Sequence, residues 1–572
     1  MAFRMIVLIW IWQALQGNLF GQNPLFIPDT LAGSEISLQL QRGTHAFFPD
    51  QMTQTMGANG NILGPTLILQ QGQNVRFAVH NQLGVLTSLH WHGMHVSPEN
   101  DGGPHTPIMA DSIWRPTFVV KDKASTYWYH PHVHHTTNEH VSKGIAGMIL
   151  VRDNEEVALP LPRTYGKDDF PLVLQTKDFD AQRQIVTHSN NDETPMVNAT
   201  LNPYLDIPAQ VVRFRVLNGA SQRSFMLGLS NNQSFFIIGT DGGLLEKPVS
   251  VKRLLISSGE RMEILVNLTG MEGQNVQLMS YASELPNGIF GATNPGMSPM
   301  MMMHEYHPNP LNGTNYSLLQ LNIKVKNDAP VLQIPETLVK VDRLDVANSN
   351  FQRNFLFTPS QMGMNQLNNP FLINNLTFDM EQINFTVPLG NTEVWELRNQ
   401  SAISHPFHVH DVQFNILSRN GIPPTAYEMG RKDVVMVRPG ETVRIIMQFL
   451  DYSHPEIPYM YHCHLLSHED DGMMGQFLVA STSATEHVEQ LKYKVSLYPN
   501  PCTDKIYTDC KNYSGEEGFV ECRNSKGQLI RKITMRKLCE EGIDTESWPQ
   551  GIYFLKIIQG KNVVTQSIAK VD

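Results

Sequence analysis

Apolar and polar residues alternate along three segments of the chain that share one pattern. These segments are Leu69–Asn81, Asp206–Asn218 and Val387–Asn399, and each of them ends in Asn. Alternation with a period of two, bounded by Gly, Pro and Asn, predicts a half-buried strand that follows a turn. We therefore expect one β-unit to be used three times.

Short strands are also predicted between these segments, for example at Phe235–Gly239, Met262–Val266 and Val443–Phe449. Long stretches with helical periodicity are scarce. A chain of 572 residues is long enough for about four domains. The patterns together predict an all-β protein with three tandem β-sandwich domains and a smaller C-terminal β-sandwich.

The start of the chain has the pattern of a signal peptide. Arg4 precedes the apolar run Met5–Trp12, and small residues follow at Gly17 and Gly21. The run is too short to span a bilayer, and no other stretch of about 18 apolar residues occurs. We expect residues 1–21 to be a cleaved signal peptide, with a buried first strand as the alternative, and we expect no transmembrane segment.

Composition excludes several classes of protein. Hydrophobic residues make up 41% and charged residues 17% of the chain, which favours buried cores over disorder. Forty-three basic residues against 54 acidic ones give a net charge of −11, which argues against a nucleic-acid partner. Only 5 Cys are present, too few for a disulfide-dense scaffold or a Cys-rich metal array.

The cysteines are unevenly placed. Cys463 stands alone in the long N-terminal part, whereas the other four lie in the tail at Cys502, Cys510, Cys522 and Cys539. They form no C-x-x-C pair, and the sequence does not choose among their three possible pairings. A small polar stretch, Ser481–Thr485, begins the change in composition, and we place a linker at 483–494.

Histidine is abundant at 22 residues, and ten of these fall in four clusters. On a strand, residues two apart point to the same face, so each H-x-H pair aims two imidazoles at one point. A single pair is usually chance, but four clusters around one Cys are not. The clusters are His90-Trp-His92, His130-Pro-His132, His405-Pro-Phe-His408-Val-His410 and His462-Cys-His464-Leu-Leu-Ser-His468.

The last cluster places Cys463 between two histidines. On a strand, the thiol points one way and both imidazoles point the other way. His405 and His468 are able to join the thiolate, with Met473 as a weak axial ligand, and His₂Cys with a long axial Met is blue-copper geometry. No H-E-x-x-H sequence supports zinc hydrolysis, and no glycine motif supports nucleotide binding.

At these residues the chain resembles the multicopper oxidases, over roughly residues 25–482. The resemblance implies three cupredoxin-like Greek-key domains, which we place at 22–158, 159–328 and 329–482. It also implies four coppers per chain, oxidation of a donor at a type 1 copper, and reduction of O₂ to water at a trinuclear cluster.

The resemblance also implies which residues bind each copper. His405, Cys463, His468 and Met473 resemble type 1 ligands, and His90 and His408 resemble type 2 ligands. The type 3 pair would be held by His92, His130, His132, His410, His462 and His464. The nearby His95, His105, His134, His135 and His140 are assigned to no copper.

Two carboxylates occupy positions that resemble the proton-supplying acids of this family. Asp101 opens Asp101-Gly-Gly-Pro104, and Glu469 follows His468. Reduction of O₂ to two waters consumes four protons, so acids near the cluster would relay them. Without the resemblance, each would be read as an ordinary turn or surface acid.

Methionines raise a question about the electron donor. Met297–Met303 holds five Met in seven positions, and Met362 and Met364 form a smaller pair. Thioethers favour Cu(I), so the cluster is a candidate segment for collecting cuprous ions. The alternative is that it is a flexible apolar loop. Cuprous oxidases of this family carry an acid and a Met just before the first type 1 His, where this chain has Ser401 and Ile403. The sequence therefore leaves the electron donor undecided between phenolic or other aromatic compounds and metal ions.

The tail resembles the C-terminal sorting domain of the type IX secretion system. Leu497-Tyr-Pro-Asn-Pro501 opens it, and Gly551-Ile-Tyr553 follows late. The resemblance implies that residues 495–572 engage the type IX machinery and that the enzyme is secreted or held at the cell surface. A carbohydrate-binding or adhesive module is the alternative. For the whole chain, a copper nitrite reductase and a copper-sequestering protein are the competing interpretations.

Overall fold

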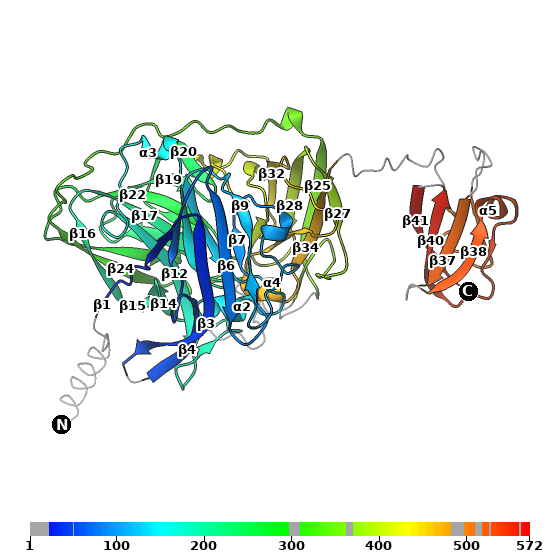
Figure 1. Ribbon diagram of the computed structural model, residues 1–572, viewed down its shortest axis with the longest axis horizontal. Helices are drawn as coiled ribbons and strands as arrows, with labels where there is room; N and C mark the ends of the chain where they lie inside the picture. Colours follow the sequence, from blue (N-terminus) through cyan, green and yellow to red (C-terminus); the bar gives the residue numbers. More distant parts are fainter. Residues whose placement is uncertain are drawn as a thin grey trace, which may run out of the picture. The chain divides into compact units, whose positions relative to one another are not determined.

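A computed structural model describes residues 22–571 apart from residue 50 and the segments 297–308, 362–369, 482–496, 509–517, 525–527 and 560–561. The proposed signal peptide, the linker and the Met297–Met303 cluster therefore lie outside the described residues. The chain divides into two compact units, residues 1–479 and 480–572, and strands dominate both (Figure 1). This confirms the predicted all-β fold class.

The first sandwich packs two sheets around a core that includes Leu38, Val79 and Ile149. One sheet runs β2 (Thr30–Ala32), β5 (Thr66–Gln70), β11 (Gly147–Arg152), β10 (Ser125–His130) and β7 (His90–His92). The other runs β4 (Gln51–Ala58), β3 (Glu35–Phe48), β6 (Asn74–Gln82) and β8 (Ile113–Trp114), with β9 (Thr117–Val119) also on β6.

The second sandwich has a core that includes Leu172, Phe214 and Leu321. Its first sheet runs β15 (Thr200–Leu201), β14 (Thr194–Val197), β12 (Asp169–Phe179), β17 (Val211–Asn218), β22 (Arg261–Asn267), β19 (Phe235–Thr240) and β20 (Gly243–Val251), with β13 (Ile185–Val186) on β12. Its second sheet runs β1 (Asn23–Pro24), β16 (Pro203–Pro208), β24 (Asn315–Lys324), β23 (Asn275–Tyr281), β18 (Phe225–Leu229) and β21 (Leu254–Ile256).

The third sandwich is packed around aromatic residues that include Phe355, Trp395 and Tyr461. One sheet runs β26 (Phe371–Ile373), β25 (Phe351–Pro359), β28 (Thr392–Asn399), β32 (Thr442–Gln448) and β30 (Asn415–Arg419). The other runs β27 (Phe385–Pro388), β34 (Met474–Ala480), β33 (Tyr459–Cys463), β29 (His405–Val409) and β31 (Val434–Val437).

Helices are short throughout the described chain. They are α2 (Thr137–Ser142), α3 (Asn154–Val157), α4 (Leu466–Asp470) and α5 (Met535–Glu541), with 3₁₀ turns at η1 (Pro98–Asn100), η2 (Ala282–Glu284), η3 (Val346–Asn348) and η4 (Ala426–Met429). No helix in the described ranges is both long and apolar enough to cross a membrane.

The terminal Asn residues of the three repeated segments make the same kind of hydrogen bonds in each sandwich. Each terminal Asn is buried, and its side-chain amide donates to at least two backbone carbonyls that lie downstream. Each side-chain oxygen also accepts from the backbone N–H two residues later. Asn81, Asn218 and Asn399 therefore lock the turn that follows the repeated strand in each sandwich.

The repeat in β17 departs most from its predicted burial. β6 alternates buried and more exposed positions as expected, but every residue of β17 is buried. The half-buried prediction for β17 is wrong because Arg213 and Arg215 are neutralised inside the protein. Arg213 pairs with Glu156 and Glu263, and Arg215 pairs with Glu263 and Asp169. Buried charges are tolerated when they are paired in this way.

The C-terminal unit is a small β structure with its own core. One sheet runs β35 (Leu497–Tyr498), β36 (Lys505–Thr508) and β39 (Ile543–Asp544), and the other runs β38 (Leu529–Thr534), β37 (Gly518–Asn524), β40 (Gly551–Gln559) and β41 (Asn562–Lys570). Val520, Leu555 and Ile568 are buried in that core. Cys502 and Cys522 are buried free thiols, whereas Cys539 is disulfide-bonded.

Candidate metal centre

One candidate site, which we call the Cys463 group, consists of His405, Cys463, His468 and Met473. His405 begins β29, Cys463 ends β33 and His468 lies on α4, and all four residues are buried. The Cys463 Sγ lies 3.5 Å from His405 Nδ1 and 3.7 Å from His468 Nδ1. The backbone of Met473 bonds to both Cys463 and His468. A thiol and two imidazoles therefore converge as a metal site requires.

The tautomer of His405 is set by a serine. The Ser401 hydroxyl donates its one hydrogen to the Asn399 side-chain oxygen or to the Ile403 carbonyl. His405 Nε2 is therefore the donor in its 2.7 Å contact with Ser401 Oγ. This leaves His405 Nδ1 without a proton on the side of the thiol. The Phe371 ring covers the group, with its centroid 4.7 Å from the His405 ring and 4.6 Å from the His468 ring. Burial raises the pKa of the Cys463 thiol, so a bound cation would be needed to hold its thiolate.

The second site, the eight-histidine group, is assembled from the first and third sandwiches. Strand pairing sets His90 opposite His130 in the first sandwich and His408 opposite His462 in the third. The remaining four members follow from the H-x-H spacing. The group consists of His90, His92, His130, His132, His408, His410, His462 and His464, all buried.

Ring nitrogens of this group meet at close range. His92 Nδ1 lies 3.3 Å from His130 Nε2, and His132 Nε2 lies 3.1 Å from the Nε2 atoms of both His410 and His462. Three subsets have ligand atoms close enough to share one ion. They are His90, His408 and His410; His92, His130 and His464; and His132, His410 and His462.

Some buried nitrogens face this space with no hydrogen-bond partner among the described residues. They are the Nε2 atoms of His90, His408 and His464. A buried polar atom is normally satisfied, so such orphans require an explanation. Burial and neighbouring rings lower the pKa values of His92, His130, His408 and His410, and those of His132 and His464 to about 3. Neutral imidazoles with free lone pairs fit metal ions.

The outer nitrogens of the rings are held by protein oxygens. His90 Nδ1 donates to the Asp101 carbonyl at 2.9 Å, and His130 Nδ1 to the Pro131 carbonyl at 2.8 Å. Such contacts fix which nitrogen each ring turns inward.

Both carboxylates singled out from the sequence lie against this group. Asp101 Oδ2 is 2.7 Å from His410 Nδ1, and Glu469 Oε2 is 3.2 Å from His462 Nδ1. Glu469 Oε1 is also 3.5 Å from His132 Nδ1. Burial opposes ionisation of Glu469, but the surrounding imidazoles outweigh it and hold the pKa of that carboxyl well below its usual range.

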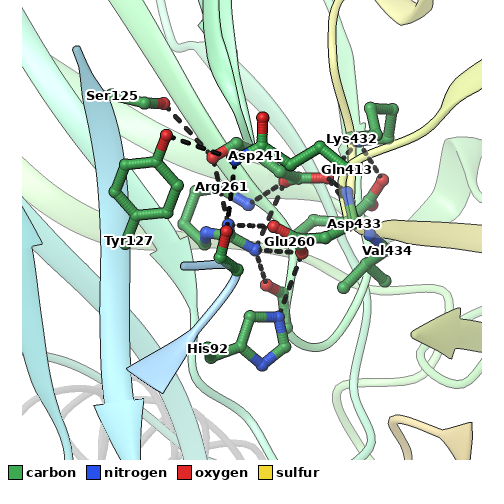
Figure 2. Close-up of polar contacts among 12 residues, drawn as sticks. His92, Ser125, Tyr127, Asp241, Glu260, Arg261, Gln413, Lys432, Asp433 and Val434 are labelled. Carbon is green, nitrogen blue, oxygen red and sulfur yellow. Dashed lines mark hydrogen bonds and ion pairs between the residues drawn. The ribbon is translucent and has the colours of Figure 1, made fainter. Parts of the chain in front are cut away.

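A third carboxylate, Asp433, was missed by sequence reasoning. Its Oδ1 lies 3.1 Å from His92 Nε2 (Figure 2). Its carbonyl accepts from His408 Nδ1 at 2.8 Å. The only sequence signal was the charged run Arg431-Lys432-Asp433 directly before the buried strand β31. Burial raises the pKa of Asp433, although Arg261 opposes this rise.

The chain connects the two groups at Cys463. Its thiol belongs to the Cys463 group, while His462 and His464 on either side belong to the eight-histidine group. A polar cavity of about 230 Å³ adjoins the Cys463 group at His468 and is also lined by His188, Gln222 and Asp471 among others. A donor in this cavity would reach His468.

Of the five unassigned histidines, His95 forms two ion pairs across the first and third sandwiches. Its Nδ1 is 2.7 Å from Asp411 and its Nε2 is 2.9 Å from Asp451. His140 contacts Thr87 and His105 contacts Gln476. His135 contacts the Asp470 carbonyl, and the centroid of its ring lies 3.6 Å from that of the His134 ring.

Three tandem sandwiches that carry a Cys–His₂ group and eight converging histidines define a metal-binding oxidoreductase of the cupredoxin-like class. The chain belongs to the multicopper oxidase family, whose models match residues 39–156, 181–285 and 340–483. Membership implies copper and the oxidation of a substrate coupled to reduction of O₂. A model of a secretion system C-terminal sorting domain matches residues 496–570, which indicates secretion or display at the cell surface.

Individual relatives cover nearly the whole first unit. A multicopper oxidase of Staphylococcus haemolyticus is 31% identical over 480 residues, or 81% of this chain and 93% of the relative. The cell division protein FtsP of Xenorhabdus nematophila is 29% identical over 478 residues, or 82% and 94% of the two chains. A solved laccase-like multicopper oxidase, CueO from Ochrobactrum sp., has a TM-score of 0.70 at 31% identity and matches 80% of this chain and 100% of its own.

Proposed function

We propose that this protein is a secreted, laccase-like oxidase with four coppers per chain. It couples one-electron oxidation of a donor to four-electron reduction of O₂ to water. His405, Cys463, His468 and Met473 hold the type 1 copper. His90 and His408 hold the type 2 copper. The type 3 pair is held by His92, His130, His132, His410, His462 and His464.

The observation that carries this proposal is the set of buried ring nitrogens that lack partners among the described residues, next to a thiol that directly follows His462 and precedes His464 in the chain. Copper, when bound by these residues, supplies the redox chemistry. The chain's own part is to hold the two groups one residue apart, so that His462-Cys463-His464 is a short covalent path for electrons. It also excludes water, since every proposed ligand is at most 4% exposed.

Protons are the second requirement. Four donors each lose one electron, and O₂ takes up four electrons and four protons to give two waters. Asp101 and Glu469 touch rings of the eight-histidine group, so they are placed to relay protons to it.

The cavity beside His468 supports a polar donor. His188, Gln222 and Asp471 offer hydrogen bonds to a hydroxylated aromatic compound, and the lining also suits a metal ion. Ser401 and Ile403 are both buried next to His405, in place of an acid and a Met. We therefore favour phenolic donors over Cu(I), and the solved relative described as oxidising lignin model compounds supports this preference.

The test is to load the purified protein with copper, count bound copper, and follow O₂ consumption with a phenol and with Cu(I). About four coppers per chain, a blue absorption band and O₂ uptake are expected. Nitrite reduction without O₂ uptake would instead identify a nitrite reductase.

A second candidate is a binding role without turnover, because relatives also include proteins named as cell division proteins. In that case, or for a copper-sequestering protein, the loaded chain would bind copper and consume no O₂. The unpartnered buried nitrogens of His90, His408 and His464 argue against a purely structural role. The His462-Cys463-His464 path between the two groups argues against storage, because storage does not require a path for electrons.

We also propose the domain boundaries and the export route. Residues 1–21 would be removed as a signal peptide, and 22–158, 159–328 and 329–482 would form the three cupredoxin domains. Residues 495–572 would pass the enzyme to the type IX machinery after the linker 483–494. Deletion of 495–572 should leave the oxidase inside the cell envelope, and unchanged release into the medium would contradict this route.

A further inference from the structure

The second sandwich supplies none of the proposed copper ligands, yet one of its loops reaches the eight-histidine group. This loop, residues 257–260, connects β21 to β22, and Arg261 begins β22. Gly259 lies against the His464 ring at a φ of +83°, and a β-carbon there would be 2.8 Å from the ring Cγ. Ser258 Oγ lies 3.5 Å from His464 Nδ1. The loop therefore packs directly on one proposed ligand.

Arg261 contacts Asp433, which orients His92 through its carboxylate and His408 through its backbone carbonyl. Its two terminal nitrogens donate to the two carboxylate oxygens of Asp433, at 2.6 and 2.5 Å (Figure 2), and the side chain is fully buried. It also donates to the Thr126 carbonyl of the first sandwich at 3.1 Å and to the Asp241 carbonyl at 3.1 Å. Arg261 is thus fixed from several sides, and Asp433 is fixed with it.

Asp433 in turn determines which nitrogens face the site. His92 Nε2 donates to Asp433 Oδ1, so His92 turns Nδ1 toward His130. His408 Nδ1 donates to the Asp433 carbonyl, so His408 turns Nε2 inward. The residue after His92 is Gly93, where any β-carbon would collide with Asp433 and lie 2.5 Å from Arg261 Nη2. The missing side chain at Gly93 therefore leaves the space that the Arg261–Asp433 ion pair occupies.

The surrounding charges support the pair instead of competing with it. Lys432 Nζ binds Asp241 at 2.8 Å and Glu260 at 3.0 Å, so the other buried carboxylates have their own cation. Removal of the Arg261 charge would leave Asp433 as an uncompensated buried anion beside His92. A lysine at this position would keep the positive charge but would not form the bidentate hydrogen bonds to Asp433.

We propose that residues 257–261 of the second sandwich are a positioning element for the trinuclear copper site. Arg261 acts through Asp433 on His92 and His408, and Gly259 supports His464. This inference rests on the proposed function, because it takes the eight-histidine group to be that site. It gives the domain without ligands a defined role in forming the centre.

The test compares Arg261→Lys with Arg213→Lys in full-length protein loaded with copper. Arg213 is a matched control because it is an equally buried arginine of the second sandwich that pairs with Glu156 and Glu263. The readouts are bound copper, the type 2 electron paramagnetic resonance signal and the type 3 near-ultraviolet band, each divided by the blue band of the Cys463 group.

Arg261→Lys should weaken copper binding at the eight-histidine group about 10- to 100-fold while the blue band stays. Arg213→Lys should leave these ratios at the wild-type value even if thermal stability falls. Unchanged ratios in Arg261→Lys would overturn the inference. Absence of the type 2 and type 3 signals from the wild type would overturn the proposed function instead.

A second pair keeps the inference falsifiable if Arg261→Lys fails to fold. Gly259→Ala and Gly270→Ala impose similar backbone strain, since Gly270 has a φ of +77°, but a β-carbon at Gly270 meets nothing within 4 Å. Gly259→Ala should lower the type 3 signal relative to the blue band, and Gly270→Ala should not. Equal ratios in the two alanine variants would contradict a role for the loop.

Discussion

The Cys463 group and the eight-histidine group are built in different ways. The Cys463 group comes from one sandwich, between His405 and Met473, and aromatic residues surround it. The eight-histidine group comes from two sandwiches and is held by carboxylates, namely Asp101, Asp433 and Glu469. One site therefore depends on the packing inside a domain, whereas the other also depends on how domains meet.

The largest expected effect comes from Cys463→Ser. The serine hydroxyl does not replace the soft thiolate, so the blue band and oxidation of donors should fall to background. The eight-histidine group should keep its copper, because its ligands and carboxylates are unchanged. Absorption spectra, bound copper and O₂ consumption check this expectation.

Cys522→Ser is the matched control, since Cys522 is also a buried free thiol but lies in the C-terminal unit. It should leave the blue band and the turnover intact. If Cys463→Ser also removed the copper of the eight-histidine group, the two groups would not be independent and the comparison would fail.

Sequence reasoning works best where a local pattern determines geometry. Strand alternation places His462 and His464 on one face and Cys463 on the other, and the repeated Asn residues mark equivalent turns. Partners that meet across domains leave no such pattern, which is why Asp433 and Arg261 were missed. The burial of β17 was predicted wrongly for a different reason: most of the carboxylates that pair with Arg213 and Arg215 lie on the neighbouring strands of the same sheet, and the alternation within one segment does not reveal them.

Glu469→Gln should produce the next largest effect, and only at the eight-histidine group. Glutamine keeps the shape but does not deliver a proton, so reoxidation by O₂ should slow by about 10²-fold. Reduction of the Cys463 group by the donor should proceed at the wild-type rate. Stopped-flow bleaching and recovery of the blue band separate the two steps.

Glu441→Gln is a suitable control, because Glu441 is a buried carboxylate of the third sandwich that pairs with Arg419. Its reoxidation rate should not change. Wild-type reoxidation in Glu469→Gln would remove Glu469 from the proton supply.

His95→Gln tests the contact between the first and third sandwiches. Burial lowers the pKa of His95, but Asp411, Asp122 and Asp451 outweigh burial and raise it to about 10. Because the folded pKa lies above the ordinary 6.5, the stabilisation is fully present below pH 6.5 and is lost as pH rises through about 10.

We expect His95→Gln to lower stability by about 1 kcal/mol below pH 6.5 and by much less above pH 10, as measured by urea unfolding. A double-mutant cycle with Asp451→Asn isolates the pair. A loss that did not change with pH would mean that the charge of His95 contributes nothing to this contact.

Ser401→Ala should affect the smallest part of the molecule, because its effect should be confined to the Cys463 group. The substitution removes the acceptor of His405 Nε2 at 2.7 Å and leaves a buried N–H without a partner, which costs about 1–3 kcal/mol. The reduction potential of the blue copper and the rate of donor oxidation should therefore change, while the type 2 and type 3 signals do not. Ser404→Ala is the control, because Ser404 Oγ is buried next to His405 and has no partner among the described residues. If both serine variants shifted the potential equally, the tautomer of His405 would not depend on Ser401, and the Cys463 group would owe its geometry to packing alone.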